Sequence, residues 1–440
     1  MKFNNIIYLL TLGLSFLAMP AFAAGAHQDP VAPILLGLVI LFTGAKIGGY
    51  IAEKIHQPAV LGELVMGVIF GNLVLLNYDG LNFINEGEVF SIMAGIGVVL
   101  LLFEVGLESS VAGLLKVGVT ATIVAIIGVV LPFFFGFFAS EFFLADKSVY
   151  VHTFIGATLC ATSVGITARV FKDLGKINIK EAQIILGAAV IDDVLGLIIL
   201  AVVSGIIMSV ASTGSADISL MSIAFIAGKA IGFLLAVVVV GGKLAPYVFR
   251  YGASLKLEGM LITLSLSFCF LLSYLANLFG LAPIVGAFAA GLIVDGAGFS
   301  KFYGKEEVSI EHLLLPVSKF FVPIFFVHMG MQVDLKTFAD MGVVGLGLAL
   351  TVVAILGKQA CGLGVWGAKN KGLNKILIGI GMVPRGEVGL IFAVIGASLK
   401  IDGIPIIDPP LYSAVVVMVI LTTMITPPAI KWSLKAKKEA

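Results

Sequence analysis

The stretch Gly187-Ala188-Ala189-Val190-Ile191-Asp192-Asp193-Val194-Leu195-Gly196 places two consecutive aspartates inside a long apolar segment. Consecutive residues of an α-helix point roughly 100° apart, so one carboxylate can face a polar cavity while its neighbour faces a packed helix. Ionisable residues inside membrane helices are costly and are functional candidates by default. The alternative interpretation, a hydrogen-bonded polar pair that only holds helices together, is the less favoured one.

The composition of the whole chain is that of a helical membrane protein. Of 440 residues, 60% are hydrophobic and only 12% are charged, and the mean hydropathy is +1.13. Soluble domains carry roughly 25% charged residues. Many apolar runs reach about twenty residues, enough to cross a hydrocarbon core about 30 Å thick. We therefore predict an all-α polytopic protein in a lipid bilayer, and the net charge of +1 indicates no nucleic-acid partner.

Residues 1–23 have the pattern of a signal peptide. Lys2 precedes an apolar run over 6–18, and Ala21-Phe22-Ala23 supplies a small-x-small cleavage pattern. An uncleaved extra helix is the alternative. In the transmembrane domain, 24–440, we predict thirteen membrane helices, over 31–52, 57–76, 89–108, 113–139, 150–171, 181–211, 217–241, 257–279, 281–297, 312–333, 340–366, 373–399 and 408–432.

The distribution of positive charge predicts the orientation of these helices. Most lysines and arginines fall in one set of alternating loops, whereas the opposite set holds only Lys147, Lys336 and Lys400. Loops rich in Lys and Arg stay in the cytoplasm, so the C-terminus is expected there. An odd number of helices then places the mature N-terminus outside, where a cleaved signal peptide would leave it.

Two of the predicted helices are interrupted in corresponding ways. The segment 150–171 contains Cys160-Ala161-Thr162-Ser163-Val164-Gly165, and the segment 373–399 contains Gly381-Met382-Val383-Pro384-Arg385-Gly386-Glu387. Proline and glycine disfavour a continuous helix in the second stretch. Paired interruptions in the two halves of a chain indicate the binding site of an inverted-repeat transporter, although no internal sequence repeat is evident here.

Lys358 is a second intramembrane charge that needs a partner. A lysine next to a carboxylate stays charged, and it loses proton affinity when the partner is removed. Pairing with Asp192 is the natural hypothesis, and it leaves Asp193 as the principal cation ligand. A static structural clamp, or a side chain that reaches the cytoplasmic face, is the alternative.

The remaining candidates lie at the two interruptions. The hydroxyls of Thr162 and Ser163, with freed backbone carbonyls, are hard oxygen ligands that suit an alkali cation such as Na⁺. Ordinary helix–helix hydrogen bonding is an equally good interpretation of both residues. We assign Arg169, Arg385 and Glu387 to structural and electrostatic support of the interruptions, with an Arg169–Glu387 ion pair as one arrangement.

Three motifs resemble the second monovalent cation:proton antiporter family across nearly the whole mature chain. They are Leu101-Leu102-Phe103-Glu104-Val105-Gly106-Leu107-Glu108, the run Ala161–Val170 followed by Asp192-Asp193, and Pro384-Arg385-Gly386-Glu387-Val388-Gly389-Leu390. The double aspartate together with Lys358 is similar to NapA-type sodium/proton antiporters.

The resemblance implies thirteen helices in inverted repeats, with two crossed discontinuous helices. It implies a mobile core, approximately 113–211 and 340–432, moving as an elevator against a dimerisation scaffold, approximately 31–108 and 217–333. It further implies a homodimer in a bacterial inner membrane that exports Na⁺ or Li⁺ electrogenically in exchange for H⁺. Asp193 would bind the cation and Asp192 would pair with Lys358. No cofactor and no enzymatic activity are expected.

Three other functions are alternatives to this one. A potassium/proton antiporter of the same family is the nearest alternative. Related potassium-efflux systems carry a nucleotide-binding domain, and this sequence shows no G-x-G-x-x-G fingerprint that opens a βαβ unit. An intramembrane aspartyl protease needs aspartates from two separate helices, which adjacent aspartates do not provide. A passive channel would show conductance rather than proton-coupled, saturable exchange.

Overall fold

The protein is described here from a computed structural model that covers residues 31–55, 57–108, 118–213, 220–255, 257, 259–296, 310–366 and 372–439. These residues are helical apart from short connections and one antiparallel hairpin, β1 (Lys400–Ile401) with β2 (Ile404–Pro405). The helices are α2 (Val31–Lys54), α3 (Ala59–Gly71), η2 (Leu73–Leu76), α4 (Asn82–Asn85), α5 (Glu88–Glu108), α7 (Val119–Phe143), α8 (Val149–Thr158), α9 (Val164–Asp173), α10 (Lys180–Thr213), α11 (Leu220–Ala236), η3 (Val237–Gly241), α12 (Gly242–Ser254), α13 (Met260–Leu278), α14 (Pro283–Gly296), α15 (Ile310–Met331), η5 (Leu335–Ala339), α16 (Met341–Gln359), η6 (Ala360–Gly364), α17 (Lys375–Gly381), α18 (Glu387–Ser398) and α19 (Pro409–Glu439).

The helices have the length and polarity of membrane spans. Within the described ranges, 9 helical stretches are long and apolar enough to cross a bilayer. The other predicted segments fall on the shorter helices α3 and α14 and on two interrupted pairs, α8 with α9 and α17 with α18. The all-helical membrane architecture is therefore confirmed, and the count of thirteen crossings stays a prediction. The expected signal peptide, 1–23, lies outside the described residues.

The chain divides into two compact units. The first comprises residues up to Leu100 together with Pro316–Asp340, and the second comprises Leu101–Leu315 together with Met341–Ala440. This division by packing is not the division into a moving core and a scaffold that the sequence suggested. That functional division stays a prediction.

Helices α2 and α3 of the first unit pack at backbone distance. A Cβ atom built on Gly62 would collide with the carbonyl oxygen of Gly48 and lie 2.9 Å from the Cβ of Ala52. Small residues permit such approaches in membranes, where lipid and side chains are equally apolar and close packing drives association. Asn72, just after α3, fixes the other end of this unit, because its side-chain Nδ2 donates to the Val333 carbonyl at 2.7 Å.

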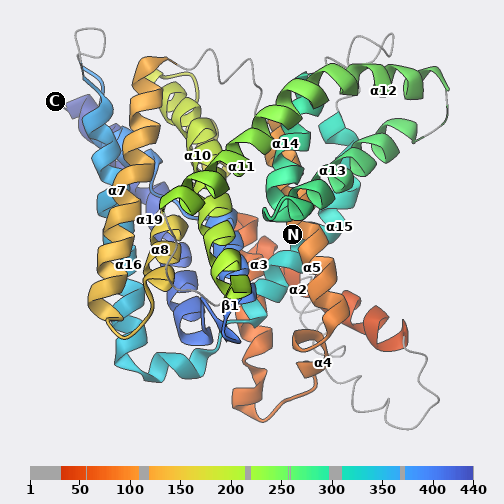
Figure 1. The fold of residues 1–440 in the computed structure, drawn as a ribbon. Coiled ribbons are helices and arrows are strands. Elements are labelled where there is room, and N and C mark those ends of the chain that lie inside the picture. The colour runs from red at the N-terminus through yellow and green to blue at the C-terminus, as the bar shows by residue number, and fades with distance from the viewer. Residues whose placement is uncertain are drawn as a thin grey trace. The chain divides into compact units, whose positions relative to one another are not determined.

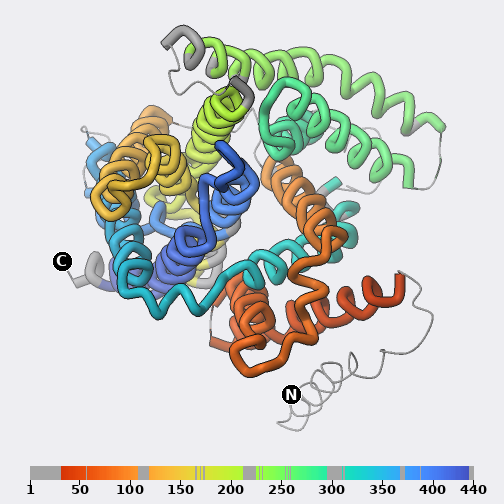
Figure 2. The backbone as a smooth tube through the Cα atoms, turned by 60° about the horizontal axis from the view of Figure 1, so that its bottom comes forward, coloured from red at the N-terminus to blue at the C-terminus, as the bar shows by residue number. Residues whose placement is uncertain are grey.

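The second unit contains the helices that carry the candidate residues. Helix α7 packs against α8, α10 and α16, and α16 also packs against α19. Figures 1 and 2 show this bundle, in which residues from the first half of the chain lie beside residues from its last quarter. Such long-range packing brings α10, with the aspartates, next to α16, with Lys358.

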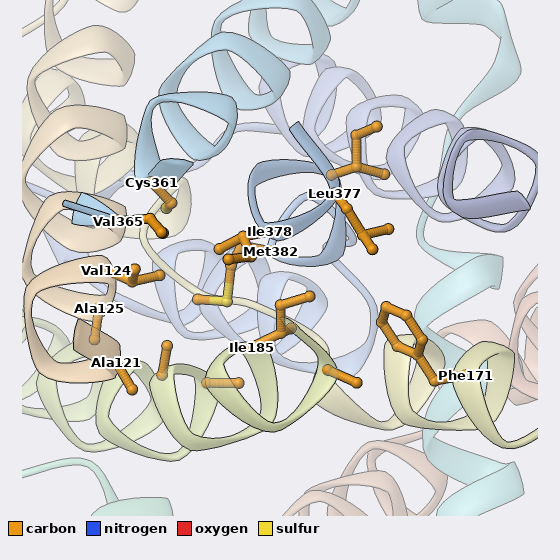
Figure 3. Close-up of a cluster of buried hydrophobic side chains, with 14 of the residues drawn as sticks. Ala121, Val124, Ala125, Phe171, Ile185, Cys361, Val365, Leu377, Ile378 and Met382 are labelled. Atoms are coloured by element: carbon orange, nitrogen blue, oxygen red, sulfur yellow. The ribbon is translucent and has the colours of Figure 1, made fainter. Parts of the chain in front are cut away.

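An apolar cluster of buried side chains joins helices of the second unit (Figure 3). Ala125 of α7, Ile185 of α10 and Met382 beside α17 are all buried within it. Burial of apolar side chains gives no net gain over lipid, so the contribution of this cluster is tight, specific packing rather than exclusion from water. The cluster therefore sets the spacing between α7, α10 and α17.

We expect Gly62→Ala to destabilise the first unit. The added methyl improves helix propensity by about 1 kcal/mol, but it must push α2 from α3, and overpacking costs about 1–3 kcal/mol. The measurement is the melting temperature of the purified protein in detergent. Gly95→Ala on α5 is the matched control, because a Cβ there meets nothing within 4 Å. A Gly62→Ala protein as stable as Gly95→Ala would contradict backbone contact between α2 and α3.

Candidate functional site

Both predicted helix interruptions are present. Helix α8 ends at Thr158 and α9 begins at Val164, while α17 ends at Gly381 and α18 begins at Glu387. In the second interruption, Pro384 has no N–H to donate and disfavours helical geometry in the residue before it. The first interruption has no proline, so its break depends on contacts with the second.

Those contacts are hydrogen bonds between the two interruptions. The amide of Ser163 donates to the carbonyl of Pro384 at 2.8 Å, and the Thr167 hydroxyl donates to the carbonyl of Gly381 at 2.7 Å. Non-helical backbone is tolerated at membrane depth only where protein or a polar cavity satisfies it. Each interruption supplies partners for the other, so the two breaks support each other.

Arg385 also stabilises the contact between the two interruptions. Its side chain is completely buried, and Nη1 donates to the carbonyl of Ala161, just beyond α8, at 2.7 Å. A cation stabilises the negative end of a helix dipole, and α8 ends here. Nε and Nη2 of the same guanidinium are buried and donate to no partner within the described part of the chain. Arg385 therefore leaves positive charge directed into the site, where it acts on Asp192.

Asp192 and Lys358 form the predicted ion pair. The Lys358 Nζ donates to Asp192 Oδ1 at 2.7 Å, and both side chains have 0% of their surface exposed. Removing one partner of such a pair leaves an uncompensated buried charge, which costs about 3–5 kcal/mol. Asp193 is also buried but retains 7% exposure. The two carboxylates thus occupy different environments, in agreement with their helical offset.

Thr162 lies between the ion pair and the second interruption. Its hydroxyl is 3.4 Å from the carbonyl of Met382, a long hydrogen bond, and it interacts with the carboxyl of Asp192. Threonine, aspartate and carbonyl oxygens are the ligands that hard cations prefer. No group of three or more His, Cys, Asp or Glu side chains with metal-site geometry occurs in the described ranges. Any cation held here would therefore be bound by this mixed set of oxygens.

Two supporting side chains cannot be placed. Arg169 belongs to α9 and Glu387 is the first residue of α18, but both side chains lie outside the described residues. Their predicted ion pair stays a prediction.

Several residues at the site were not identified from the sequence. Thr167 bridges the interruptions, and the thiols of Cys160 and Cys361 are buried close enough to the ion pair to be affected by its charges. Gly128 of α7 also borders the pair. The one available signal was Pro132, a proline within an apolar helix, which marks a local break in helical hydrogen bonding.

Known proteins are similar to this chain along most of its length. Residues 28–436 match the family described as sodium/hydrogen exchanger, transmembrane. The high-affinity Na⁺/H⁺ antiporter NhaS3 of Synechocystis is 36% identical over 443 residues, covering 93% of this chain and 92% of that protein. The Na⁺/H⁺-K⁺ antiporter GerN of Bacillus cereus is 34% identical, covering 92% of this chain and 97% of that protein.

A solved structure has the same fold. The sodium proton antiporter NhaP1 of Methanocaldococcus jannaschii matches with a TM-score of 0.67 at 16% identity, covering 97% of this chain and 99% of that one. These relatives are transporters rather than enzymes and use no cofactor, since the ions they move are their substrates. The chain, with its paired interruptions and buried charges, belongs to the transmembrane sodium/hydrogen exchanger family of cation/proton antiporters.

Proposed function

We propose that this protein is an electrogenic Na⁺(Li⁺)/H⁺ antiporter of the NapA type, which exports sodium by an elevator mechanism. The observation that carries the proposal is the fully buried pair between Lys358 of α16 and Asp192 of α10, the helix that also carries Asp193. Asp193 is the principal cation ligand, with Thr162 and Ser163 as auxiliary ligands. Asp192 is the partner of Lys358, and its carboxylate is released when the site changes occupancy.

Charge balance explains how cation and proton exchange at one site. Asp192, Asp193, Lys358 and Arg385 sum to zero charge when all are ionised, and all four side chains are buried. A cation that enters adds a charge which the protein can offset only by releasing protons. When both carboxyl groups are protonated and Lys358 stays charged, the site can release two protons for one Na⁺, and the exchange then moves net charge.

The transport cycle follows from that balance. Facing the cytoplasm, the site exchanges protons for Na⁺, which Asp193 holds with hydroxyl and backbone oxygens. The core, approximately 113–211 and 340–432, then slides against the scaffold, approximately 31–108 and 217–333. External protons release the cation, and the protonated site returns with Lys358 as its stabilising charge.

The same proposal includes the setting of the protein. Thirteen membrane helices in inverted repeats follow a cleaved signal peptide, 1–23, with the N-terminus outside and the C-terminus in the cytoplasm. The protein works as a homodimer in a bacterial inner membrane. The strong bias of Lys and Arg toward one set of loops supports this orientation.

Potassium is the second candidate cation. The observation that favours it is the relative GerN, whose name includes both Na⁺ and K⁺. Side-by-side titration of proteoliposomes with Na⁺, Li⁺, K⁺ and Rb⁺ decides between the two. Sodium and lithium are expected to release internal protons at lower concentrations than potassium or rubidium. A lower half-saturating concentration for K⁺ would replace sodium with potassium in the proposal.

Asp193→Asn is expected to abolish exchange. The amide keeps the size of the side chain but removes the charge that attracts the cation and accepts the proton, so the rate in proteoliposomes falls at least about 100-fold. Asp402→Asn is the matched control, because Asp402 is exposed in the turn of the β1–β2 hairpin. Normal Na⁺-driven proton release by Asp193→Asn would remove Asp193 from the mechanism.

Lys358→Ala is expected to lose charge coupling and stability together. An Asp192 charge left without its partner costs about 3–5 kcal/mol, so the melting temperature falls. Membrane-potential-driven Na⁺ uptake into vesicles reports the coupling. The double variant Asp192→Asn/Lys358→Ala removes both charges of the pair, so its melting temperature should recover toward that of the native protein while coupling stays lost. Undiminished voltage dependence in Lys358→Ala would reject the coupling role of the lysine.

A further inference from the structure

Besides α10 and α16, a third helix, α7, borders the Lys358–Asp192 ion pair with one of its faces. Gly128, Pro132 and Gly136 follow each other at intervals of four residues and are all buried. Residues at this spacing share one face of a helix. Helix α7 packs against both α10 and α16, the two helices that carry Asp192 and Lys358. This face of α7 therefore borders the pair that the proposed mechanism uses.

Gly128 lies directly against the charged atoms. A Cβ atom built there would be 2.9 Å from the Cys361 Sγ, 3.4 Å from the Lys358 Nζ and 3.5 Å from the Asp192 Oδ1. The first distance requires a shift, and the second is tighter than ordinary packing. Lys358 and Asp192 thus meet in space that any side chain at position 128 would occupy.

Pro132 leaves the backbone carbonyl of Gly128 without its usual helical hydrogen bond. Proline has no N–H, so it cannot donate the helical hydrogen bond to the carbonyl four residues earlier, which is that of Gly128. Pro132 also packs against Gly357, the neighbour of Lys358, because a Cβ on Gly357 would lie 3.0 Å from its Cα. The same proline therefore frees the Gly128 carbonyl and sets the approach of the lysine.

The Lys358 ammonium can donate more hydrogen bonds than the one described for it. An ammonium group has three donors, and the interaction described for Lys358 is the single bond to Asp192. When a proton or cation neutralises Asp192, the ammonium loses that acceptor. A buried ammonium without an acceptor is strongly unfavourable, so a transport cycle that neutralises Asp192 requires a second acceptor within reach.

We propose that Gly128 is a positioning residue for Lys358: its missing side chain lets the lysine reach Asp192, and its freed carbonyl receives the ammonium while Asp192 is neutral. This inference rests on the proposed function, because it assigns the second acceptor that the cycle needs. The lysine moves between two acceptors on neighbouring helices without leaving the buried site. Helix α7 is then part of the coupling machinery and more than a packing partner.

The first test is a double-mutant cycle between Gly128→Ala and Lys358→Ala. In the native background the added methyl displaces the ammonium from Asp192, so proteoliposome assays should show the apparent KM for Na⁺ rising roughly 3- to 10-fold. Gly345→Ala on α16 is the control, because a Cβ there meets nothing within 4 Å. With Lys358→Ala present, the contact with the ammonium is gone and the contact with the Cys361 Sγ remains, so Gly128→Ala should have a much smaller further effect on the apparent KM.

Melting temperatures of the same four proteins, measured in detergent, separate a failure of the proposed function from a failure of the inference about Gly128. If native protein shows no Na⁺/H⁺ exchange, the proposed function fails, but the thermal cycle still tests the contact. Gly128→Ala should lower the melting temperature in the native background and much less beside Lys358→Ala. An equal drop in both backgrounds would show ordinary overpacking and overturn the inference.

Pro132→Ala tests the carbonyl. The alanine N–H can donate to the Gly128 carbonyl and so competes with the ammonium for this acceptor. Maximal exchange rate should fall several-fold, while the apparent KM for Na⁺ stays within about twofold, because resting pairing with Asp192 is kept. An unchanged maximal rate, or a loss confined to KM, would overturn the assignment of this carbonyl.

Discussion

A lysine and an aspartate held 2.7 Å apart with no exposed surface form the interaction on which the other features of the bundle depend. Two charges at membrane depth are tolerable only together, since either one alone would be a buried, uncompensated ion. Helices α10 and α16 must therefore stay in register with each other whatever else moves. The close approach of α7, with glycine beside the pair, keeps that register without placing another side chain among the charges.

The interruptions solve a related problem for the backbone. Unwound chain exposes N–H and C=O groups that lipid cannot satisfy. Here the two unwound stretches hydrogen-bond to each other, and Arg385 covers the carbonyl of Ala161 beyond α8. Polar backbone and hydroxyl oxygens are thereby brought beside Asp192 without opening the fold. The same contacts that make the breaks stable also assemble a set of oxygens suited to a small cation.

The sequence predicts the site best at residues whose burial in an apolar helix is energetically unfavourable. Asp192 and Lys358 are 166 positions apart, yet each is too unfavourable alone in an apolar helix, and this was enough to predict the pair. Pro384 likewise predicted a break, because its effect on helical hydrogen bonding is local. Residues that are energetically acceptable on their own in an apolar helix give no such signal. Thr167 and Gly128 become important only through neighbours that packing of α7, α10 and α17 brings to them.

The glycines show most clearly which features the sequence alone does not predict. At Gly62 the absent side chain lets two helices meet, while at Gly128 it leaves space for two charged groups, and at Gly95 it meets nothing at all. The three look alike in an apolar run, because what each permits is decided by atoms from distant parts of the chain. A buried charge identifies itself through its energetic cost, whereas the space it needs is identified only when the helices around it are placed. In the proposed coupling, the lysine stays charged while its partner is neutralised, so the arrangement of that space matters as much as the charges.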